Sequence, residues 1–264
     1  MTVYTIASGK GGAGKSSFTL NMGAALSELG LKTLVIDCDI GMANLNLMIK
    51  LESETKISLH EVLAGKADVH EAINHTSYGM DVIPSGISIS GFKQADPEKL
   101  RDVMGQIVDE YDFILIDSPA GISKESVVPL AVCDEAILIV NPELPSITDA
   151  LKTKLMADIV GRKVKGAVIN RVMGTKGELG ASKIAELLEV SILGVLPNDR
   201  NVMKATAFKV PVVIKEPNSP VAKKIKKIAK KIANVEVLEE GEARGEKKEN
   251  GFIERLLKSL GVKT

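Results

Sequence analysis

The chain has 264 residues, of which 45% are hydrophobic, and this is enough to build one large α/β domain or two small ones. Basic and acidic residues number 34 each, so the formal net charge is zero and whole-molecule attraction to DNA has no support. The two cysteines, Cys38 and Cys133, lie far apart and form no CxxC motif, which favours buried thiols in a reducing compartment.

The apolar runs also limit where the protein can reside. The longest of them is far shorter than the ~20 residues that a helix needs to cross a bilayer. The first residues lead directly into a predicted strand and do not resemble a signal peptide. We therefore expect a cytoplasmic protein, or one that attaches to the membrane from its cytosolic side.

Apolar runs and amphipathic runs alternate from the first residues onward. The apolar runs predict buried strands at residues 3–7, 33–39, 112–119, 135–140, 165–170 and 191–197. Helical periodicity predicts helices at residues 16–29, 97–110, 123–131, 148–160 and 181–189. Strands that are apolar throughout and alternate with helices are typical of a parallel sheet covered on both faces. We therefore predict an α/β fold with a mostly parallel sheet and helices on both faces.

Residues 221–231 (VAKKIKKIAKK) place apolar side chains at helical spacing and lysines on the opposite side. Ser219 before Pro220 is typical of a helix start, as is Asp96 before Pro97. We interpret residues 221–231 as the last core helix. Its lysines can add attraction to anionic lipid or to DNA.

The composition changes after Asn234. Residues 235–250 are charged and nearly free of apolar side chains after Leu238, whereas residues 251–264 (GFIERLLKSLGVKT) are again patterned with apolar residues. The sequence therefore predicts a folded domain at 1–234, a charged flexible linker at 235–250 and an amphipathic helix at 251–264.

A glycine-rich segment, SGKGGAGKSS, occupies residues 8–17 and fits the pattern GxxxxGK[ST] between a predicted strand and a predicted helix. Backbone N–H groups of such a loop converge on phosphate oxygens, and the positive end of the following helix points at them. We expect Lys15 to reach the β- and γ-phosphates, Ser16 to bind Mg²⁺ and Ser17 to contact the α-phosphate. The other loop residues in the predicted nucleotide site are Gly11, Gly12, Ala13 and Gly14. A glycine-rich turn without a ligand is the alternative.

Acidic residues end two of the predicted strands. Asp117 closes the run FILID, at the position where P-loop enzymes keep the acid that holds Mg²⁺, often through water. Asp37 and Asp39 close the strand at 33–39, and Asp39 is a second candidate for the metal. The carboxyl ends of parallel strands face one crevice, where ligands bind. A helix-capping role is the alternative, and it is strongest for Asp37.

Several segments together resemble the MinD branch of the deviant Walker A family of P-loop ATPases, which also includes ParA proteins and the nitrogenase iron protein. They are SGKGGAGKSS, VIDCDIGMANLNLMI, FILIDSPAGI, DEAILIVNPE, VINRV, GVLPNDRNVMKA and GFIERLLKSL, and the resemblance covers nearly the whole chain. It implies a nitrogenase-iron-protein-like fold, ATP with Mg²⁺ as cofactors, and a homodimer that forms with ATP.

The resemblance implies roles for individual residues. Lys10 is the signature lysine, which crosses the dimer interface to the partner's nucleotide as an arginine finger does; a solvated surface lysine is the alternative. Asp39 is implied to position the attacking water. Asn170 is implied to bind adenine, with a strand-end turn residue as the alternative. The remaining implied residues are Asn44 in switch I, Asp117, Pro119 and Gly121 in switch II, and Pro197 and Asp199 beside the base.

The carboxy-terminal segment resembles the membrane-targeting sequence of the MinD branch. At 100° per residue its apolar side chains share one face, and these are Phe252, Ile253, Leu256, Leu257 and Leu260. Such a helix can lie in the interface of an anionic membrane. A terminal helix that packs on its own domain or on a partner is the alternative.

The leading interpretation is a Mg-ATP-dependent switch for dimerisation and membrane association, with slow hydrolysis that a protein activator accelerates. Such a protein places division-site or other polar machinery. The alternatives are a ParA-type DNA-segregation ATPase and a flagellar-number regulator of the same branch. The amphipathic tail and the zero net charge make DNA an improbable partner. Cys38 and Cys133 give little support to a metallocluster protein, and no acceptor motif supports a kinase.

Overall fold

The computed structural model describes residues 1–39, 45–52, 57–86, 96–121 and 123–235. Their strands form one sheet in the order β3-β4-β2-β5-β1-β6-β7-β8. Every neighbouring pair is parallel except β3 and β4, which are antiparallel. The strands are β1 (Thr2–Ala7), β2 (Thr33–Asp37), β3 (Asn74–His75), β4 (Asp81–Ile83), β5 (Phe113–Asp117), β6 (Glu135–Val140), β7 (Lys163–Val172) and β8 (Ile192–Pro197).

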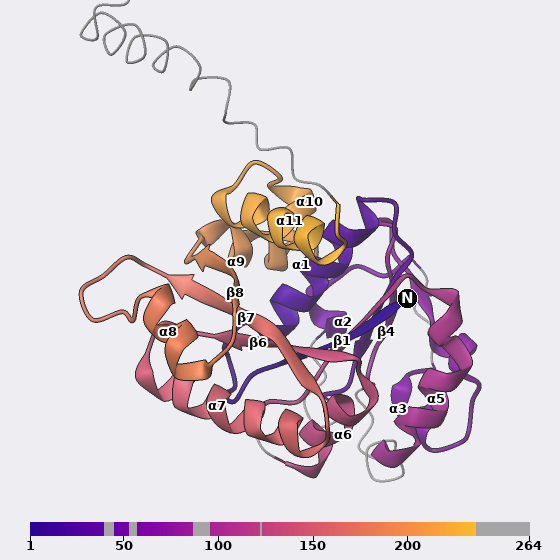
Figure 1. The fold of residues 1–264 in the computed structure, drawn as a ribbon. Coiled ribbons are helices and arrows are strands. Elements are labelled where there is room, and N and C mark those ends of the chain that lie inside the picture. The colour runs from indigo at the N-terminus through magenta and orange to yellow at the C-terminus, as the bar shows by residue number, and fades with distance from the viewer. Residues whose placement is uncertain (40–44, 53–56, 87–95, 122, 236–264) are drawn as a thin grey trace, which may run out of the picture.

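Helices cover both faces of this sheet (Figure 1). Those on one face are α1 (Lys15–Ser27), α9 (Arg200–Ala207), α10 (Val212–Lys215) and α11 (Pro220–Ile232). Those on the other are α3 (Leu59–Leu63), α5 (Leu100–Ile107), α6 (Lys124–Val132), α7 (Leu144–Ile159) and α8 (Ala181–Leu188). The shorter helical segments are α2 (Leu45–Met48) and three 3₁₀ turns, η1 (Val69–Ala72), η2 (Pro97–Lys99) and η3 (Val108–Glu110). The predicted α/β class and mostly parallel sheet are confirmed.

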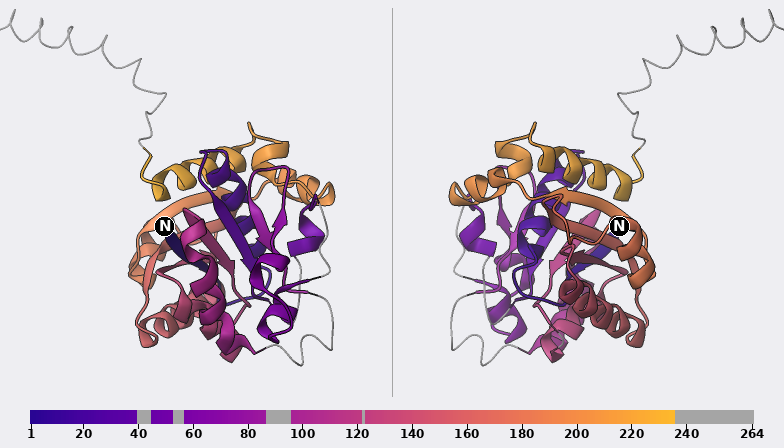
Figure 2. Two further views of the ribbon diagram at one scale, coloured as in Figure 1. Left: turned by 90° about the vertical axis from the view of Figure 1, so that its right-hand side faces the viewer. Right: turned by 90° about the vertical axis from the view of Figure 1, so that its left-hand side faces the viewer.

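The central strands are buried on both faces because they carry apolar side chains at successive positions. In β5, Phe113 and Leu115 pack with α1 and α11, whereas Ile114 and Ile116 pack with α3 and α5. In β6, Leu138 joins a third cluster with α7 and α8. Because successive side chains of a strand point to opposite faces, one apolar run serves two hydrophobic layers. Figure 2 shows the sheet and the helices that cover its two faces from two opposite sides.

The strand boundaries agree with the sequence patterns to within two residues. The run at 135–140 is β6 as predicted, whereas β7 extends beyond its predicted 165–170 at both ends. The two short strands β3 and β4 were not predicted from the sequence. Among the described residues, no helix is long and apolar enough to cross a membrane. The predicted amphipathic helix at 251–264, and the linker from residue 236 onward, lie outside the described residues.

Candidate nucleotide-binding site

The glycine-rich loop connects β1 to α1, as the motif predicts. Gly14 lies at the amino-terminal cap of α1 with φ of 94°, a left-handed conformation that glycine adopts readily. A Cβ atom at Gly14 would stand 2.3 Å from Nδ2 of Asn170. Asn170 at the end of β7 therefore packs directly against the loop, and its amide donates to the carbonyl of Ala13 at 2.8 Å. The sequence predicted both elements, and the structure brings them into contact.

Lys15 and Asp117 form the buried centre of the site. The Nζ atom of Lys15 lies 3.8 Å from Oδ1 of Asp117, and the two side chains are 9% and 1% exposed. Burial raises the pKa of Asp117, whereas the Lys15 cation and hydrogen bonds from Ser16 and Thr19 lower it. The second oxygen, Oδ2, is buried without a hydrogen-bond partner among the described residues. A buried carboxylate oxygen in this state is a suitable acceptor for a metal-bound water.

Asp37 lies beside Asp117, because β2 and β5 pair in parallel with these two residues opposite each other. Its oxygens accept hydrogen bonds from the backbone N–H groups of Asp39, at 3.0 Å, and Leu45, at 3.4 Å. Burial, reinforced by the Asp117 charge, raises the pKa of Asp37 to about 8. Asp37 thus holds both ends of the segment that contains the predicted switch I residues.

Asp39 is half-buried, and Asn44 lies outside the described residues. The structure therefore locates one of the two predicted switch I side chains. The alternative role of Asp37 as a capping residue agrees in part with the structure. Its carboxylate accepts hydrogen bonds from the N–H groups of Asp39 and of Leu45, the first residue of α2. The sequence predicts that Asp37 ends a strand. It gives no local signal for the hydrogen bond that Asp37 accepts from Leu45.

The predicted switch II segment follows β5 and is bonded to β1 and its loop. The Ser118 hydroxyl donates to the carbonyl of Ile6 at 3.0 Å. Gly121, with φ of 88°, donates its N–H to the carbonyl of Ser8 at 3.3 Å. Pro119 lies between them, half-buried. In this structure the Gly121 N–H group is thus directed to the protein chain beside the phosphate loop.

Lys10 has a different environment from Lys15. Its Nζ atom lies 3.6 Å from Oε1 of Glu143, and both side chains are 52% exposed. Glu143 precedes α7, whose residue Asp149 packs so closely on Gly9 that a Cβ there would lie 2.2 Å from the Asp149 backbone. The loop is therefore seated on α7, with Lys10 at the surface. Glu143 was not among the predicted site residues, because the pairing depends on the fold.

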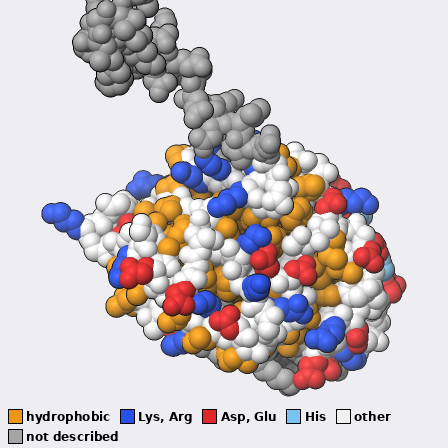
Figure 3. All heavy atoms as spheres, in the orientation of Figure 1, with side chains coloured by type: hydrophobic (Ala, Val, Ile, Leu, Met, Phe, Trp, Pro, Cys, Tyr) orange, Lys and Arg blue, Asp and Glu red, His pale blue; other side chains and the backbone are white. Residues whose placement is uncertain are grey.

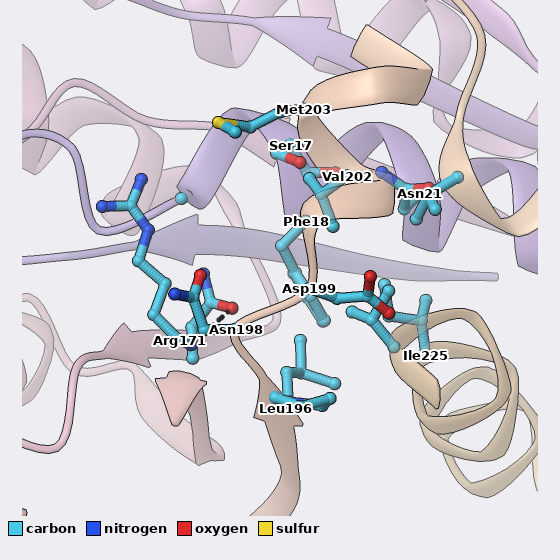
Figure 4. A pocket seen from close by; sticks show the side chains of 15 residues that line it. Ser17, Phe18, Asn21, Arg171, Leu196, Asn198, Asp199, Val202, Met203 and Ile225 are labelled. Carbon is cyan, nitrogen blue, oxygen red and sulfur yellow. Dashed lines mark hydrogen bonds between the residues drawn. The ribbon is translucent and has the colours of Figure 1, made fainter. Parts of the chain in front are cut away.

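A cavity of about 330 Å³ adjoins the loop, between α1, the ends of β7 and β8, and α11 (Figure 4). Its wall includes the predicted Gly14, Ser17, Asn170, Pro197 and Asp199. The lining residues that had no prediction are Phe18, Asn21, Arg171, Leu196, Asn198, Val202, Met203, Val212, Val221 and Ile225. Several of them lie in the segments VINRV and GVLPNDRNVMKA, but only the fold brings these segments together with α1 and α11 around one cavity.

Two polar side chains at this cavity, Asp199 and Asn170, are held in place by hydrogen bonds within the protein. Asp199 caps α9 by accepting the Asn201 N–H group through Oδ1, while its Oδ2 atom is buried without a hydrogen-bond partner in the described part of the chain. Asn170 accepts the Arg171 N–H group at 2.9 Å, which fixes the side chain that touches the loop. Apolar walls with a few oriented polar groups are typical of a small-molecule site.

Replacing Asn170 with alanine is expected to weaken ADP binding about tenfold, because the phosphate loop loses the hydrogen bond from Asn170 Nδ2 to the Ala13 carbonyl. Titration with a fluorescent ADP analogue measures this. Asn198→Ala, at the same cavity, is the matched control and should bind within about twofold of the wild type. Equal losses in the two variants would contradict a specific role for Asn170.

Comparisons with known proteins agree with this geometry. Residues 4–212 match the model of the CobQ/CobB/MinD/ParA nucleotide-binding domain. An uncharacterized ATP-binding protein of Methanocaldococcus jannaschii is 44% identical, over 97% of this chain and 95% of its own length.

Two similar structures carry information about ligands and partners. The septum site-determining protein MinD of Pyrococcus horikoshii, complexed with Mg-ADP, is 34% identical with a TM-score of 0.84, over 88% of this chain and 95% of that chain. The MinC:MinD cell division complex of Aquifex aeolicus has a chain that is 29% identical with a TM-score of 0.81, over 90% of this chain and 98% of that one.

The buried lysine, the free Asp117 oxygen and the glycine-rich loop are the groups that a magnesium nucleotide requires. This site therefore binds ATP with Mg²⁺. With the family model matched over most of the folded chain, the protein belongs to the MinD/ParA family of P-loop nucleotide-binding proteins, as a MinD-like member.

Proposed function

We propose that this protein is an ATPase that switches between a monomer and an ATP-bound homodimer, and that the dimer attaches to the membrane. The observation that carries the proposal is the different placement of the two loop lysines. Lys15 is buried against Asp117, where it serves its own nucleotide, whereas Lys10 is half exposed at the surface. A surface lysine in a phosphate loop is positioned to reach a nucleotide in a second copy.

The chemistry of hydrolysis in this proposal is positioning and charge stabilisation. Lys15 and the loop N–H groups hold the phosphates, and Ser16 with Asp117 holds Mg²⁺, which neutralises phosphate charge. Asp39 orients the attacking water, and Asp37 fixes the segment that carries Asp39. The partner's Lys10 adds a second positive charge that stabilises the negative charge on the transferred phosphoryl group. Turnover is then slow for the monomer and rises in the dimer.

Membrane attachment in this proposal depends on the segment at 251–264. One amphipathic helix with five large apolar side chains binds weakly, because ordering the chain offsets part of the gain from burial. Two copies in a dimer gain avidity, on the order of a hundredfold or more. ATP binding thus promotes attachment, and hydrolysis promotes release. As in the MinD relatives, we propose a role in placing cellular machinery, with a protein partner that accelerates hydrolysis.

Dimerisation tests the proposal directly. The molar mass measured by light scattering after size-exclusion chromatography should double with Mg-ATP or a non-hydrolysable analogue, and should remain that of the monomer with Mg-ADP. The rate per chain should rise with protein concentration in the range where dimers form. A monomer in all nucleotide states, with turnover independent of concentration, would overturn the proposal.

A further inference from the structure

The positive charge of this neutral chain is concentrated on one side of the sheet. Between residues 200 and 235 there are ten Lys and Arg residues and one acidic residue, Glu216. This part therefore carries a formal charge of +9, and the remainder of the chain carries −9. Helix α9 contacts α10, and α10 contacts α11, so the charged elements form one continuous side of the molecule (Figure 2).

Helix α11 carries six of these ten basic residues. Lys223, Lys224, Lys227 and Lys231 are exposed, while Val221, Ile225, Ile228 and Ile232 are buried on the opposite face. The Nζ atom of Lys226 forms an ion pair with Oε2 of Glu28, the residue that follows α1, at 2.8 Å. Lysines four residues apart on a helix repel one another, which makes the helix less stable. An anionic surface against this face relieves the repulsion.

Exposed apolar side chains lie within the same side of the molecule. Phe208 is 62% exposed and Met203 is 72% exposed. The Nζ atom of Lys215 stands 4.1 Å from the centre of the Phe208 ring. Lysines beside exposed aromatic and thioether groups are typical of surfaces that meet lipid headgroups, where the apolar parts reach the acyl boundary.

The end of the described chain lies on this side as well. The last described residue, Val235, lies three residues after the end of α11, so the chain leads from the lysine-bearing helix toward the segment at 251–264. Figure 3 shows Lys and Arg side chains grouped at the upper edge of the molecule, beside the point where the described chain ends. Val221 and Ile225 of the same helix line the nucleotide cavity from its inner face.

We propose that the α9–α11 side, with the exposed lysines of α11 at its centre, is a second membrane contact that docks on anionic lipid headgroups. It acts together with the segment at 251–264 and orients the domain with α11 toward the bilayer. This inference rests on the proposed membrane switch. It specifies which surface of the domain contacts the membrane, that the lipid headgroups are anionic, and how the bound domain is oriented.

The test uses full-length protein with a non-hydrolysable ATP analogue and a variant that combines Lys223→Gln, Lys224→Gln and Lys231→Gln. Vesicles contain equal parts of phosphatidylglycerol and phosphatidylcholine, or phosphatidylcholine alone. The variant should lose about tenfold or more in affinity for the anionic vesicles, and salt should weaken the wild type more than the variant. Binding to neutral vesicles should be the same for both proteins.

The matched control combines Lys163→Gln, Lys176→Gln and Lys183→Gln, which removes the same charge from exposed positions on β7, α8 and the loop between them. It should bind anionic vesicles nearly as the wild type does. Unchanged ADP affinity and thermal unfolding show that both variants are folded. Equal losses in the two triple variants would overturn the proposal, because net charge alone would then explain the effect.

Two further outcomes separate this inference from the proposed function. If the wild type binds anionic vesicles with the ATP analogue and the α11 variant binds equally well, this inference fails and the membrane switch stands. If the wild type binds no vesicles in any nucleotide state, both fail. Fluorescence anisotropy with labelled duplex DNA tests whether this face binds nucleic acid. Loss of DNA binding in the α11 variant with vesicle binding intact would assign this face to nucleic acid instead.

Discussion

Replacing Lys10 with alanine is expected to abolish ATP-dependent dimerisation and to lower maximal hydrolysis roughly a hundredfold or more, while ADP affinity stays near the wild-type value. The side chain is half exposed, and its pair with Glu143 at 3.6 Å contributes little to folding. A cation supplied in trans to a phosphoryl group contributes far more, about 10³–10⁵ in rate in related P-loop enzymes. Light scattering and a phosphate-release assay measure the two effects.

Glu143→Gln is the matched control for this variant, because it removes the same ion pair but keeps the lysine. It should dimerise with ATP at least as well as the wild type. Loss of dimerisation in both variants would mean that the Lys10–Glu143 pair holds the loop in shape. A dimer that persists in Lys10→Ala would instead support the alternative of a solvated surface lysine.

Replacing Lys15 with alanine is expected to weaken ATP and ADP binding about a hundredfold or more, since the β- and γ-phosphates lose their buried cation. It should also lower the free energy of unfolding by about 2 kcal/mol. This is less than the ~3–5 kcal/mol typical of a broken buried pair, because Asp117 can take up a proton. Calorimetric titration and chemical denaturation measure these effects.

The pH dependence of this variant gives an internal check. Without Lys15 the pKa of Asp117 rises further above its unfolded value, so the folded state binds more protons than the unfolded state. The destabilisation by Lys15→Ala should therefore be smallest in acid and grow as the pH rises toward neutrality. Lys10→Ala serves as the control in the same loop. Wild-type nucleotide affinity in Lys15→Ala would contradict the assignment of the loop.

The sequence predicted the fold well where periodicity and strand ends carry the information. The run at 135–140 is β6, and Ser219 caps α11 through a hydrogen bond from the Ala222 N–H group. The helix predicted at 148–160 begins earlier, at Leu144, because Leu144 is 61% exposed and does not extend the apolar stripe of α7. β3 and β4 are two and three residues long, too short for a periodic signal.

The site residues likewise divide into those with a local sequence signal and those that only the fold brings together. The motif residues of the loop and Asp117 were predicted because their chemistry follows a fixed local spacing. Asn21 could not be predicted, since it links the Ser17 carbonyl in its own helix to the Val213 N–H group in α10. Glu143 and the apolar cavity wall similarly come from segments that only the fold brings together. Asp37 was predicted as an acid at a strand end. Its hydrogen bond from Leu45 was not, because the two residues are eight positions apart and lie on either side of switch I.

The most direct test of the switch is co-sedimentation with vesicles of phosphatidylglycerol and phosphatidylcholine. Full-length protein and a chain that ends at Asn250 are compared with Mg-ATP, a non-hydrolysable analogue and Mg-ADP. We predict that only the full-length protein pellets strongly, that it does so with ATP or the analogue, and that ADP releases it. Equal pelleting in all nucleotide states, or equally strong pelleting without residues 251–264, would contradict a membrane switch that depends on ATP and on this segment.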